Sequence, residues 1–375
     1  MVNSNVNALG VIFANTYDNL VPELVAERSM ASIPFGGRYR LIDFTLSSMA
    51  NAGIDNVSVI VRKNYHSLMD HLGAGREWDL TRKRGGLNIV PPYAQSQSKV
   101  YHGRVEALYS IVNFLAEQKE KYVVISDCNV ASDLNFAHLI DAHVKSGANV
   151  TMVYERAEIA KPITTDNYTF TMDDAGRVTE IRWNDYRMGV QNLSMGVIVM
   201  DREELIAMVK DAAVQNRMYL ERDILGPSLK ILHVQGYEYS GYRARIYDIK
   251  SYFDENMRLL CPENVAQLFP TERPVYTKVR DELPARYMDD AWVLNSMVAD
   301  GCIIEGEVEN SILFRGVRVE KGAKVQNCIL MQGTVIQQGA TLKYAITDKN
   351  VRVNPGRMLM GHNTYPLSIA KNEIV

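Results

Sequence analysis

The sequence predicts an α/β domain with a mostly parallel sheet, followed by a left-handed parallel β-helix. Three observations support this prediction. Short β-rich segments alternate with amphipathic segments from Leu9 to about Met200, prolines accumulate after Tyr252, and a six-residue hydrophobic period begins beyond Asn295. A length of 375 residues suits two domains, with ample chain for a large core.

The first part of the chain alternates strand-like and helix-like patterns, as in a sheet covered by helices on both faces. We interpret residues 10–14, 57–61, 122–125, 150–154 and 195–200 as strands. Ile42, Leu46 and Met49 have helical spacing before the Asn51-Ala52-Gly53 stop, and residues 134–145 form a second helical candidate.

The last part of the chain repeats aliphatic residues and glycines every six positions. This is the period of a left-handed β-helix, in which each side of a triangular coil buries one aliphatic residue. An irregular all-β cap is the alternative. The repeats are Val319/Val325/Met331, Leu330/Ile336/Leu342, Gly316/Gly322 and Gly333/Gly339.

Domain boundaries follow from these patterns. We place a first domain at residues 1–250, a linker at 251–290 and the β-helix at 291–375. The linker contains Pro262, Pro270, Pro274 and Pro284, which we expect to interrupt regular structure.

Composition excludes several classes of protein. The formal net charge of −3 provides no basic surface for nucleic acid or an anionic membrane. The N-terminal segment has no basic region and no long apolar run, so we expect neither a signal peptide nor a membrane span. Four cysteines without CxxC spacing and seven histidines without a metal-ligand motif favour a reduced, cytoplasmic protein without a zinc site.

One long motif carries a family resemblance. The stretch Pro34-Phe35-Gly36-Gly37-Arg38-Tyr39-Arg40-Leu41-Ile42-Asp43-Phe44, continuing to Ile54, closely resembles bacterial glucose-1-phosphate adenylyltransferase, also called ADP-glucose pyrophosphorylase. Shorter matches at Tyr101-His102-Gly103, Ser194-Met195-Gly196 and Ser251-Tyr252 extend it over nearly the whole chain. The resemblance implies a Rossmann-like nucleotidyltransferase (GT-A-like) domain before the β-helix. It also implies a reaction of ATP with glucose 1-phosphate that requires Mg²⁺.

The positions that match the family's catalytic motifs hold other residues. The glycine-rich phosphate loop corresponds to residues 15–20, which contain no glycine and add the charge of Asp18 where phosphate would lie. The two family lysines correspond to Met30 and Asn184. Removal of one positioned electrostatic group commonly costs roughly 10²–10⁴ in rate. We therefore expect no intact catalytic site.

The family's two metal aspartates correspond to Asn129 and Arg245. A cation at a Mg²⁺ site is repulsive, by roughly 4 kcal/mol per unit charge at an effective dielectric of about 20. Asp127 and Asp248 lie close by in sequence and leave a residual metal site as an open alternative. Gln95 and Gly103 correspond to a vestigial nucleotide pocket.

The resemblance is strongest to degenerate, regulatory partner subunits of the GlgD type. It implies a hetero-oligomer, such as a tetramer, with a catalytic subunit that holds the Mg²⁺ and ATP, and no certain cofactor in this chain. It also implies a phosphorylated metabolite as effector, with Arg28, Arg40 and Lys343 as candidate contacts. Two alternatives stay open: an active adenylyltransferase with rearranged metal ligands, and a stand-alone sensor of sugar phosphates or nucleotides.

Overall fold

The structure is a computed structural model that describes residues 6–92, 103–160, 167–185 and 187–375. Its N-terminal domain is built on a nine-stranded sheet of order β10-β9-β11-β6-β1-β4-β5, in which β8 pairs with β11 and β12. The strands are β1 (Ala8–Phe13), β4 (Asn56–Ile60), β5 (Gly86–Val90), β6 (Tyr122–Asp127), β8 (Val150–Ile159), β9 (Tyr168–Met172), β10 (Val178–Trp183), β11 (Gly189–Asp201) and β12 (Val234–Glu238).

This sheet is mixed, so the expectation of a mostly parallel sheet is wrong for half of it. Strands β5, β4, β1 and β6 are parallel to one another, and β12 is parallel to β8. Strand β11 runs antiparallel to β6, β8 and β9, and β9 and β10 form an antiparallel pair. Hydrophobic runs mark these segments as strands, but the direction in which a strand pairs is decided by distant partners.

Helices cover both faces of the sheet. Apolar side chains of α2, α3 and α6 pack on one face, and those of α4, α5 and α7 pack on the other. The helices of this domain are α1 (Pro22–Val25), α2 (Leu41–Asn51), α3 (His66–Leu72), α4 (Arg104–Ser110), α5 (Val112–Glu117), α6 (Phe136–Ser146), α7 (Arg202–Val214) and α8 (Gly226–Ser228). The five predicted strands and both predicted helices are therefore confirmed, with small shifts at their ends.

The C-terminal domain is a β-helix of three five-stranded parallel sheets. The first sheet contains β14 (Arg286–Tyr287), β17 (Ile303–Ile304), β20 (Arg318–Val319), β23 (Val335–Ile336) and β26 (Arg352–Val353). The second contains β15 (Trp292–Leu294), β18 (Glu307–Glu309), β21 (Lys324–Gln326), β24 (Thr341–Lys343) and β27 (Met358–Met360). The third contains β16 (Met297–Val298), β19 (Ile312–Leu313), β22 (Ile329–Leu330), β25 (Ala345–Thr347) and β28 (Leu367–Ile369).

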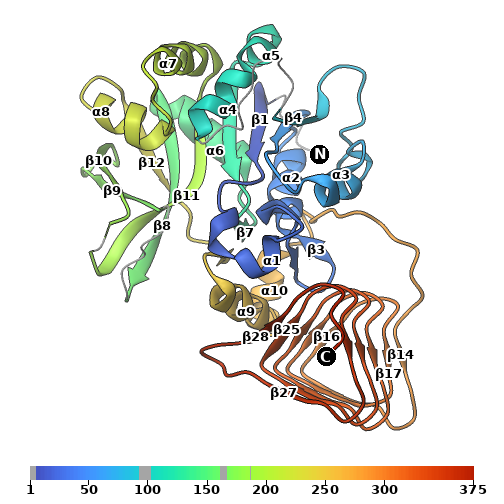
Figure 1. Cartoon of the computed structure of the whole chain (residues 1–375). Helices are drawn as coiled ribbons and strands as arrows, with labels where there is room; N and C mark the ends of the chain where they lie inside the picture. Colours follow the sequence, from blue (N-terminus) through green and yellow to red (C-terminus); the bar gives the residue numbers. More distant parts are fainter. Residues whose placement is uncertain (1–5, 93–102, 161–166, 186) are drawn as a thin grey trace.

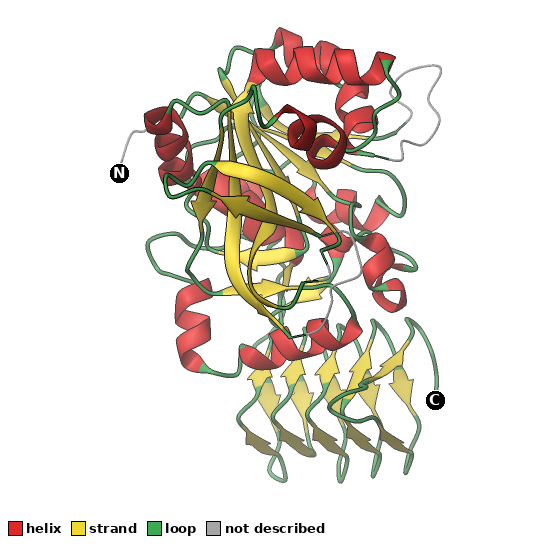
Figure 2. Cartoon of the chain, turned by 90° about the vertical axis from the view of Figure 1, so that its left-hand side faces the viewer, coloured by secondary structure: helices red, strands yellow, loops and turns green. Residues whose placement is uncertain are grey.

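The six-residue pattern predicted this architecture correctly. Val319, Val325 and Leu342 are fully buried inside the coils. Gly316 and Gly322 occupy turns with φ of 69°, a conformation in which a side chain would be strained. Figure 2 shows the coils stacked below the N-terminal domain.

The segment predicted as a linker contains two helices, α9 (Ile249–Arg258) and α10 (Pro262–Leu268). Pro262 begins α10 instead of interrupting regular structure, because the missing N–H of proline costs nothing in the first helical turn. The first β-helix strand, β14, starts at Arg286, inside the predicted linker. No helix in the described part of the chain has the length and apolar character needed to cross a membrane.

The two domains share an apolar core. Ile312, Ile329 and Ile346, from the third sheet of the β-helix, pack in one cluster with Phe253 and Leu259 of the α9 region. Helix α9 also fixes the hairpin formed by β2 (Pro34–Phe35) and β3 (Tyr39–Arg40). The Tyr252 hydroxyl donates to the Pro34 carbonyl at 2.7 Å, and the Gly36 N–H donates to Asn256 Oδ1 at 3.0 Å. Figure 1 shows α9 and α10 lying directly against the β-helix.

Candidate functional site

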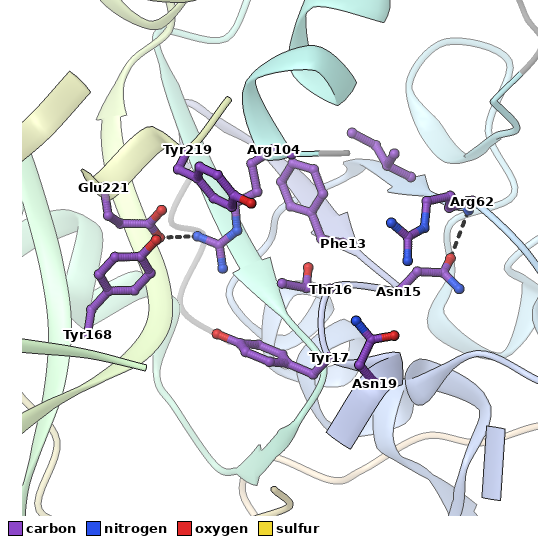
Figure 3. Close-up of a pocket in the computed structure, with 12 residues that line it drawn as sticks. Phe13, Asn15, Thr16, Tyr17, Asn19, Arg62, Arg104, Tyr168, Tyr219 and Glu221 are labelled. Carbon is purple, nitrogen blue, oxygen red and sulfur yellow. Dashed lines mark hydrogen bonds and ion pairs between the residues drawn. The ribbon is translucent and has the colours of Figure 1, made fainter. Parts of the chain in front are cut away.

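A cavity of about 180 Å³ opens at the carboxyl ends of β1 and β4, the edge at which open α/β sheets bind ligands. Figure 3 shows Arg104 near its centre, with the loop after β1 on one side and tyrosines on the other. We call it the nucleotide-type pocket. Its lining residues are Phe13, Asn15, Thr16, Tyr17, Asn19, Ile60, Arg62, Gly103, Arg104, Tyr168, Tyr219 and Glu221.

The loop after β1 folds inward. Residues Asp18–Leu20 form a 3₁₀ turn, and Asp18 is buried and does not line the pocket. Its carboxylate accepts hydrogen bonds from Asn15 Nδ2 at 2.7 Å and from the Met30 N–H at 2.8 Å. Burial raises the pKa of Asp18. The expectation that Asp18 puts its charge where phosphate would lie is therefore wrong; the carboxylate holds the loop in its closed shape.

A buried ion triad lies at the wall of the pocket, which Arg104 and Glu221 line and Asp127 does not. The Arg104 guanidinium pairs with Asp127 through one nitrogen and with Glu221 through the other, and all three side chains are at most 8% exposed. The Thr16 hydroxyl also donates to Asp127 Oδ1 at 2.9 Å. Burial raises the pKa of Asp127, and the Arg104 guanidinium opposes that shift. Two carboxylates thus neutralise the cation, and the triad carries a net negative charge.

The residues matched to the metal aspartates make structural contacts. Asn129 is buried, with Nδ2 at 3.5 Å from the Ile246 carbonyl. Arg245, on β13 (Arg243–Arg245), donates to Glu155 Oε1 and to the Ser194 carbonyl, each at 2.7 Å. Neither of these residues lines the pocket.

Asp248 caps a helix. Its Oδ1 accepts the Ser251 N–H at 2.6 Å, and Ser251 Oγ accepts the Asp248 N–H at 2.9 Å, which forms a capping box at the start of α9. Asp127 is engaged by Arg104 and Thr16. The two aspartates proposed as a residual metal pair therefore have separate structural partners, and this donor set does not fit Mg²⁺. The described residues contain no group of three or more His, Cys, Asp or Glu side chains able to hold a metal ion.

Other predicted pocket residues are dispersed. Met30 is buried in the core shared by the two domains. Asn184 has φ of 49°, and its Oδ1 accepts the Asn167 N–H at 3.1 Å, so it links the end of β10 to the chain just before β9. Gly103 does line the pocket, where a Cβ atom would come within 2.2 Å of the Met218 carbonyl oxygen. Gln95 lies outside the described residues.

A second, smaller cavity of about 40 Å³ lies where the β2–β3 hairpin, the chain before the β-helix and the β-helix itself meet. Six of its lining side chains are arginine or lysine, and none of the lining residues identified among those the structure describes is acidic. We call it the basic interdomain cavity. It is lined by Pro34, Gly37, Arg38, Tyr39, Arg40, His71, Lys278, Arg280, Phe314, Arg315, Gln332 and Lys349.

Two cations of this cavity are poorly compensated. Arg315 is 8% exposed, and its Nε and Nη2 have no hydrogen-bond partner among the described residues. Burial, together with the charges of Arg40 and Arg28, lowers the pKa of Lys349 to about 7. Burial also lowers the pKa of Arg40 to about 10. Buried guanidinium groups without acceptors are costly, and an anion would supply the missing acceptors.

The three residues predicted to contact an effector lie at different places relative to this cavity. Arg40 lines the basic interdomain cavity, and its Nη1 donates to the Ser67 carbonyl at 2.6 Å. Arg28 lies outside the lining and pairs with Asp348 at 2.7 Å. Lys343 is on β24, in another sheet of the β-helix, and does not line this cavity. A six-residue period does not specify which face of the coil meets the first domain.

Sequence reasoning missed the most informative residues. Arg104 and Glu221 belong to no motif, and 117 positions separate them. Arg315, Gln332 and Lys349 are spaced by one 17-residue coil, the interval that also relates Arg318 to Val335 in adjacent strands. That longer period was a usable signal, since it places these three side chains in one column.

Comparison with known proteins agrees with this architecture. A family model described as nucleotidyl transferase matches residues 20–180, and one described as GlmU-like, C-terminal hexapeptide matches residues 284–365.

Individual relatives match along most of the chain. It is 36% identical to a glycogen biosynthesis protein GlgD from Bacillus subtilis over 98% of this chain and 96% of that protein. A GlgD protein from Geobacillus stearothermophilus is 36% identical, over 86% of this chain and 83% of the relative. A glucose-1-phosphate adenylyltransferase from Bacillus cytotoxicus is 29% identical, over 85% of each chain.

Proposed function

The chain belongs to the nucleotidyltransferase family that includes the GlgD glycogen biosynthesis proteins and the glucose-1-phosphate adenylyltransferases, and we propose that it is a regulatory, catalytically inactive subunit in glycogen biosynthesis. The observation that carries the proposal is the buried ion triad of Arg104, Asp127 and Glu221 at the wall of the nucleotide-type pocket. The subunit acts in the cytoplasm beside a catalytic subunit that makes ADP-glucose from ATP and glucose 1-phosphate.

The triad opposes catalysis in two ways. Arg104 forms ion pairs with both Asp127 and Glu221, the carboxylates that could have faced a metal cation. Their interaction with Arg104 therefore competes with metal binding. The negative charge that remains repels a triphosphate, and electrostatic stabilisation of developing charge is the main device of phosphoryl transfer. The loop of residues 15–20, closed by Asp18, also lacks the glycines that let a backbone approach phosphate.

We include a partner in the proposal because the two-domain fold is intact, while the catalytic groups expected from the family are replaced. The sheet, the Phe35–Ile54 region and the β-helix form a continuous packed molecule. A subunit of this kind can bind its homologue and shift that homologue between states of different activity. We therefore propose a hetero-oligomer with a catalytic glucose-1-phosphate adenylyltransferase.

Regulation is assigned to the basic interdomain cavity, which we propose as the site of a phosphorylated metabolite. Its cations come from three parts of the chain: Arg40 from the β2–β3 hairpin, Arg280 from the segment before the β-helix, and Arg315 from the β-helix. A bound phosphate would join these parts and stiffen the angle between the domains. Arg315, whose Nε and Nη2 have no acceptor in the described part of the chain, is the residue we expect to matter most.

The test is an activity assay with and without a catalytic partner. The purified chain, given ATP, Mg²⁺ and glucose 1-phosphate, should release pyrophosphate at the rate of a no-enzyme control. Co-expressed with a catalytic subunit from the same genome, it should co-elute with that subunit and raise its kcat/KM or its response to phosphorylated metabolites.

The variant Arg315→Gln should keep the subunits together while it removes the metabolite response. Arg318→Gln, exposed on β20, is the matched control and should behave as the unchanged chain. Turnover by the chain alone near that of the catalytic subunit would favour an active enzyme instead. Absence of co-elution and of any kinetic effect would favour a stand-alone sensor.

A further inference from the structure

Two lysines line the basic interdomain cavity, and their surroundings differ. Lys278 Nζ forms an ion pair with Asp70 Oδ1 at 3.1 Å. Lys349 lies half-buried in a turn of the β-helix, and its Nζ has no ion-pair partner among the described residues. The amine of Lys349 therefore has no direct contact that favours its charged form.

The charges near Lys349 are mostly positive. Arg40, Arg28 and Arg280 disfavour its protonation, and Asp348 favours it. Asp348 is itself engaged by Arg28 at 2.7 Å. Burial and these charges lower the pKa of Lys349 to about 7, so about half of these amines carry no proton at neutral pH. A neutral amine has a free lone pair and is a nucleophile.

Hydrogen-bond donors stand beside this amine in a column formed by Arg315, Gln332 and Lys349. The Gly333 N–H donates to the Arg315 carbonyl at 3.1 Å, which sets the first two coils in register. The Asn350 N–H donates to the Gln332 carbonyl at 2.9 Å in the same way one coil further. Arg315 and Lys349 are thus two coils apart, roughly 10 Å between backbones, a span that two long side chains can bridge.

The donors of this column lack an acceptor. Arg315 is 8% exposed, and its Nε and Nη2 have no hydrogen-bond partner among the described residues. The Gln332 side chain lines the same cavity and carries an amide that can also donate. A carboxylate formed on the lysine itself would accept from both side chains and would bring the negative charge that the cavity lining lacks.

We propose that Lys349 reacts with carbon dioxide to form a carbamate, and that Arg315 and Gln332 bind the carboxylate so formed. The lone pair of Nζ attacks the carbon of carbon dioxide, and an N–C bond forms. One electron pair of a C=O bond moves onto oxygen, and the nitrogen releases one proton to water. The neutral amine becomes an anion of charge −1, and the step requires no oxidant, reductant or cofactor.

The size and the charge of the cavity both suit this reaction. Its volume of about 40 Å³ admits a triatomic electrophile. The carbamate stays attached to the chain, so an external phosphate or sulfate would compete with it for Arg315. Carbamate formation does not rest on the regulatory role proposed above, since it needs only the amine, the donors and dissolved carbon dioxide.

The first experiment looks for the modification directly. The purified full chain is equilibrated with isotopically labelled carbon dioxide and treated with triethyloxonium, which converts a carbamate to a stable ester, and mass spectrometry of the peptides then locates the label. The label should be on Lys349. At constant carbon dioxide pressure its amount should rise at least about tenfold from pH 6 to pH 8, because the reaction consumes the neutral amine and releases a proton.

Three variants test the residues involved. Lys349→Arg keeps a cation but cannot form the carbamate, and it should carry no label at this position. Arg315→Gln should reduce the labelling of Lys349 at least about tenfold. Lys321→Arg is the matched control: this lysine of the β-helix is exposed and pairs with Asp290 at 2.7 Å, and its replacement should leave the labelling of Lys349 unchanged. Circular dichroism shows that each variant is folded.

A second experiment separates the carbamate from bicarbonate bound as a free anion. Sulfate binding is measured by thermal unfolding with and without carbon dioxide, at fixed pH and ionic strength. Carbon dioxide should weaken sulfate binding to the unchanged chain and leave it unaltered in Lys349→Arg. Equal weakening in both would overturn the proposal in favour of bound bicarbonate. Absence of label on Lys349, or equal label on Lys321, would also overturn it; if sulfate still bound, the anion site would stand.

Discussion

Arg28 and Asp348, 320 residues apart in the sequence, form a buried ion pair 2.7 Å long. Arg28 follows the loop of the nucleotide-type pocket, and Asp348 lies in a turn of the β-helix, so the pair joins the domains. The Lys349 N–H also donates to Asp348 Oδ1 at 2.6 Å. This contact connects the basic interdomain cavity to the chain that lines the other pocket.

Replacement of Arg28 by methionine should destabilise the protein strongly. The change leaves the Asp348 carboxylate buried without its cation, which typically costs about 3–5 kcal/mol. Unfolding in urea measures the loss of stability, because urea is uncharged and does not screen ion pairs. Glu27→Gln is the neighbouring control: its pair with Lys371 is exposed, and such pairs contribute about 0–1 kcal/mol. Equal losses for both variants would contradict the structural role given to Arg28.

Replacement of Arg104 by methionine should destabilise the protein more at pH 7.5 than at pH 5.5. Burial raises the pKa of Asp127, and without the opposing Arg104 guanidinium it rises further, so the folded state binds more protons than the unfolded state. Stability of the variant therefore falls as pH rises through that raised pKa and returns as pH is lowered. Arg222→Met, which removes a partly exposed partner of Asp223, should show no such pH dependence in urea unfolding. A pH-independent loss in the Arg104 variant would contradict a buried carboxylate pair.

Anion binding in the basic interdomain cavity should weaken as pH rises from 6 to 8. Lys349 has a pKa of about 7, and a bound anion favours its protonated form, so the affinity should fall about tenfold over this range. Sulfate is the probe because its charge is constant there, and its stabilising effect on thermal unfolding is compared with chloride at equal ionic strength. Lys349→Met should bind more weakly at pH 6 and lose the pH dependence. Lys371→Met, outside the cavity, is the control.

Replacement of Gly103 by alanine should disturb the wall of the nucleotide-type pocket. The new Cβ would meet the Met218 carbonyl oxygen at 2.2 Å, so α4 or the opposing segment must move. Overpacking of this kind typically costs about 1–3 kcal/mol. Gly226→Ala is the matched control, because its nearest contact is 3.3 Å away and its backbone is helical. The melting temperatures of both variants test this prediction. A Gly103→Ala protein with an unchanged melting temperature would show that α4 and the segment of Met218 can separate without loss of stability.

Local patterns were enough for most secondary structure. The β-helix was predictable because each coil repeats the same turn and the same inward aliphatic, as at Val325 and Leu342. The segment of α2 was predictable because Ile42, Leu46 and Met49 mark one buried face. Local patterns did not predict which of the strands from β8 through β12 pair in parallel and which antiparallel. The hydrophobic pattern of β11 is the same whether its neighbours are parallel or antiparallel.

By itself, the sequence determined the identities at the positions matched to the family's motifs: residues 15–20 contain no glycine, and the others hold Met30, Asn184, Asn129 and Arg245. Only the tertiary structure decided what the replacements do. It turned Asp18 inward, brought Arg104 between Asp127 and Glu221, and moved Lys343 to a different face from Lys349. The physical reason is that charges act through distance and burial, and both depend on residues that folding brings together from far along the chain.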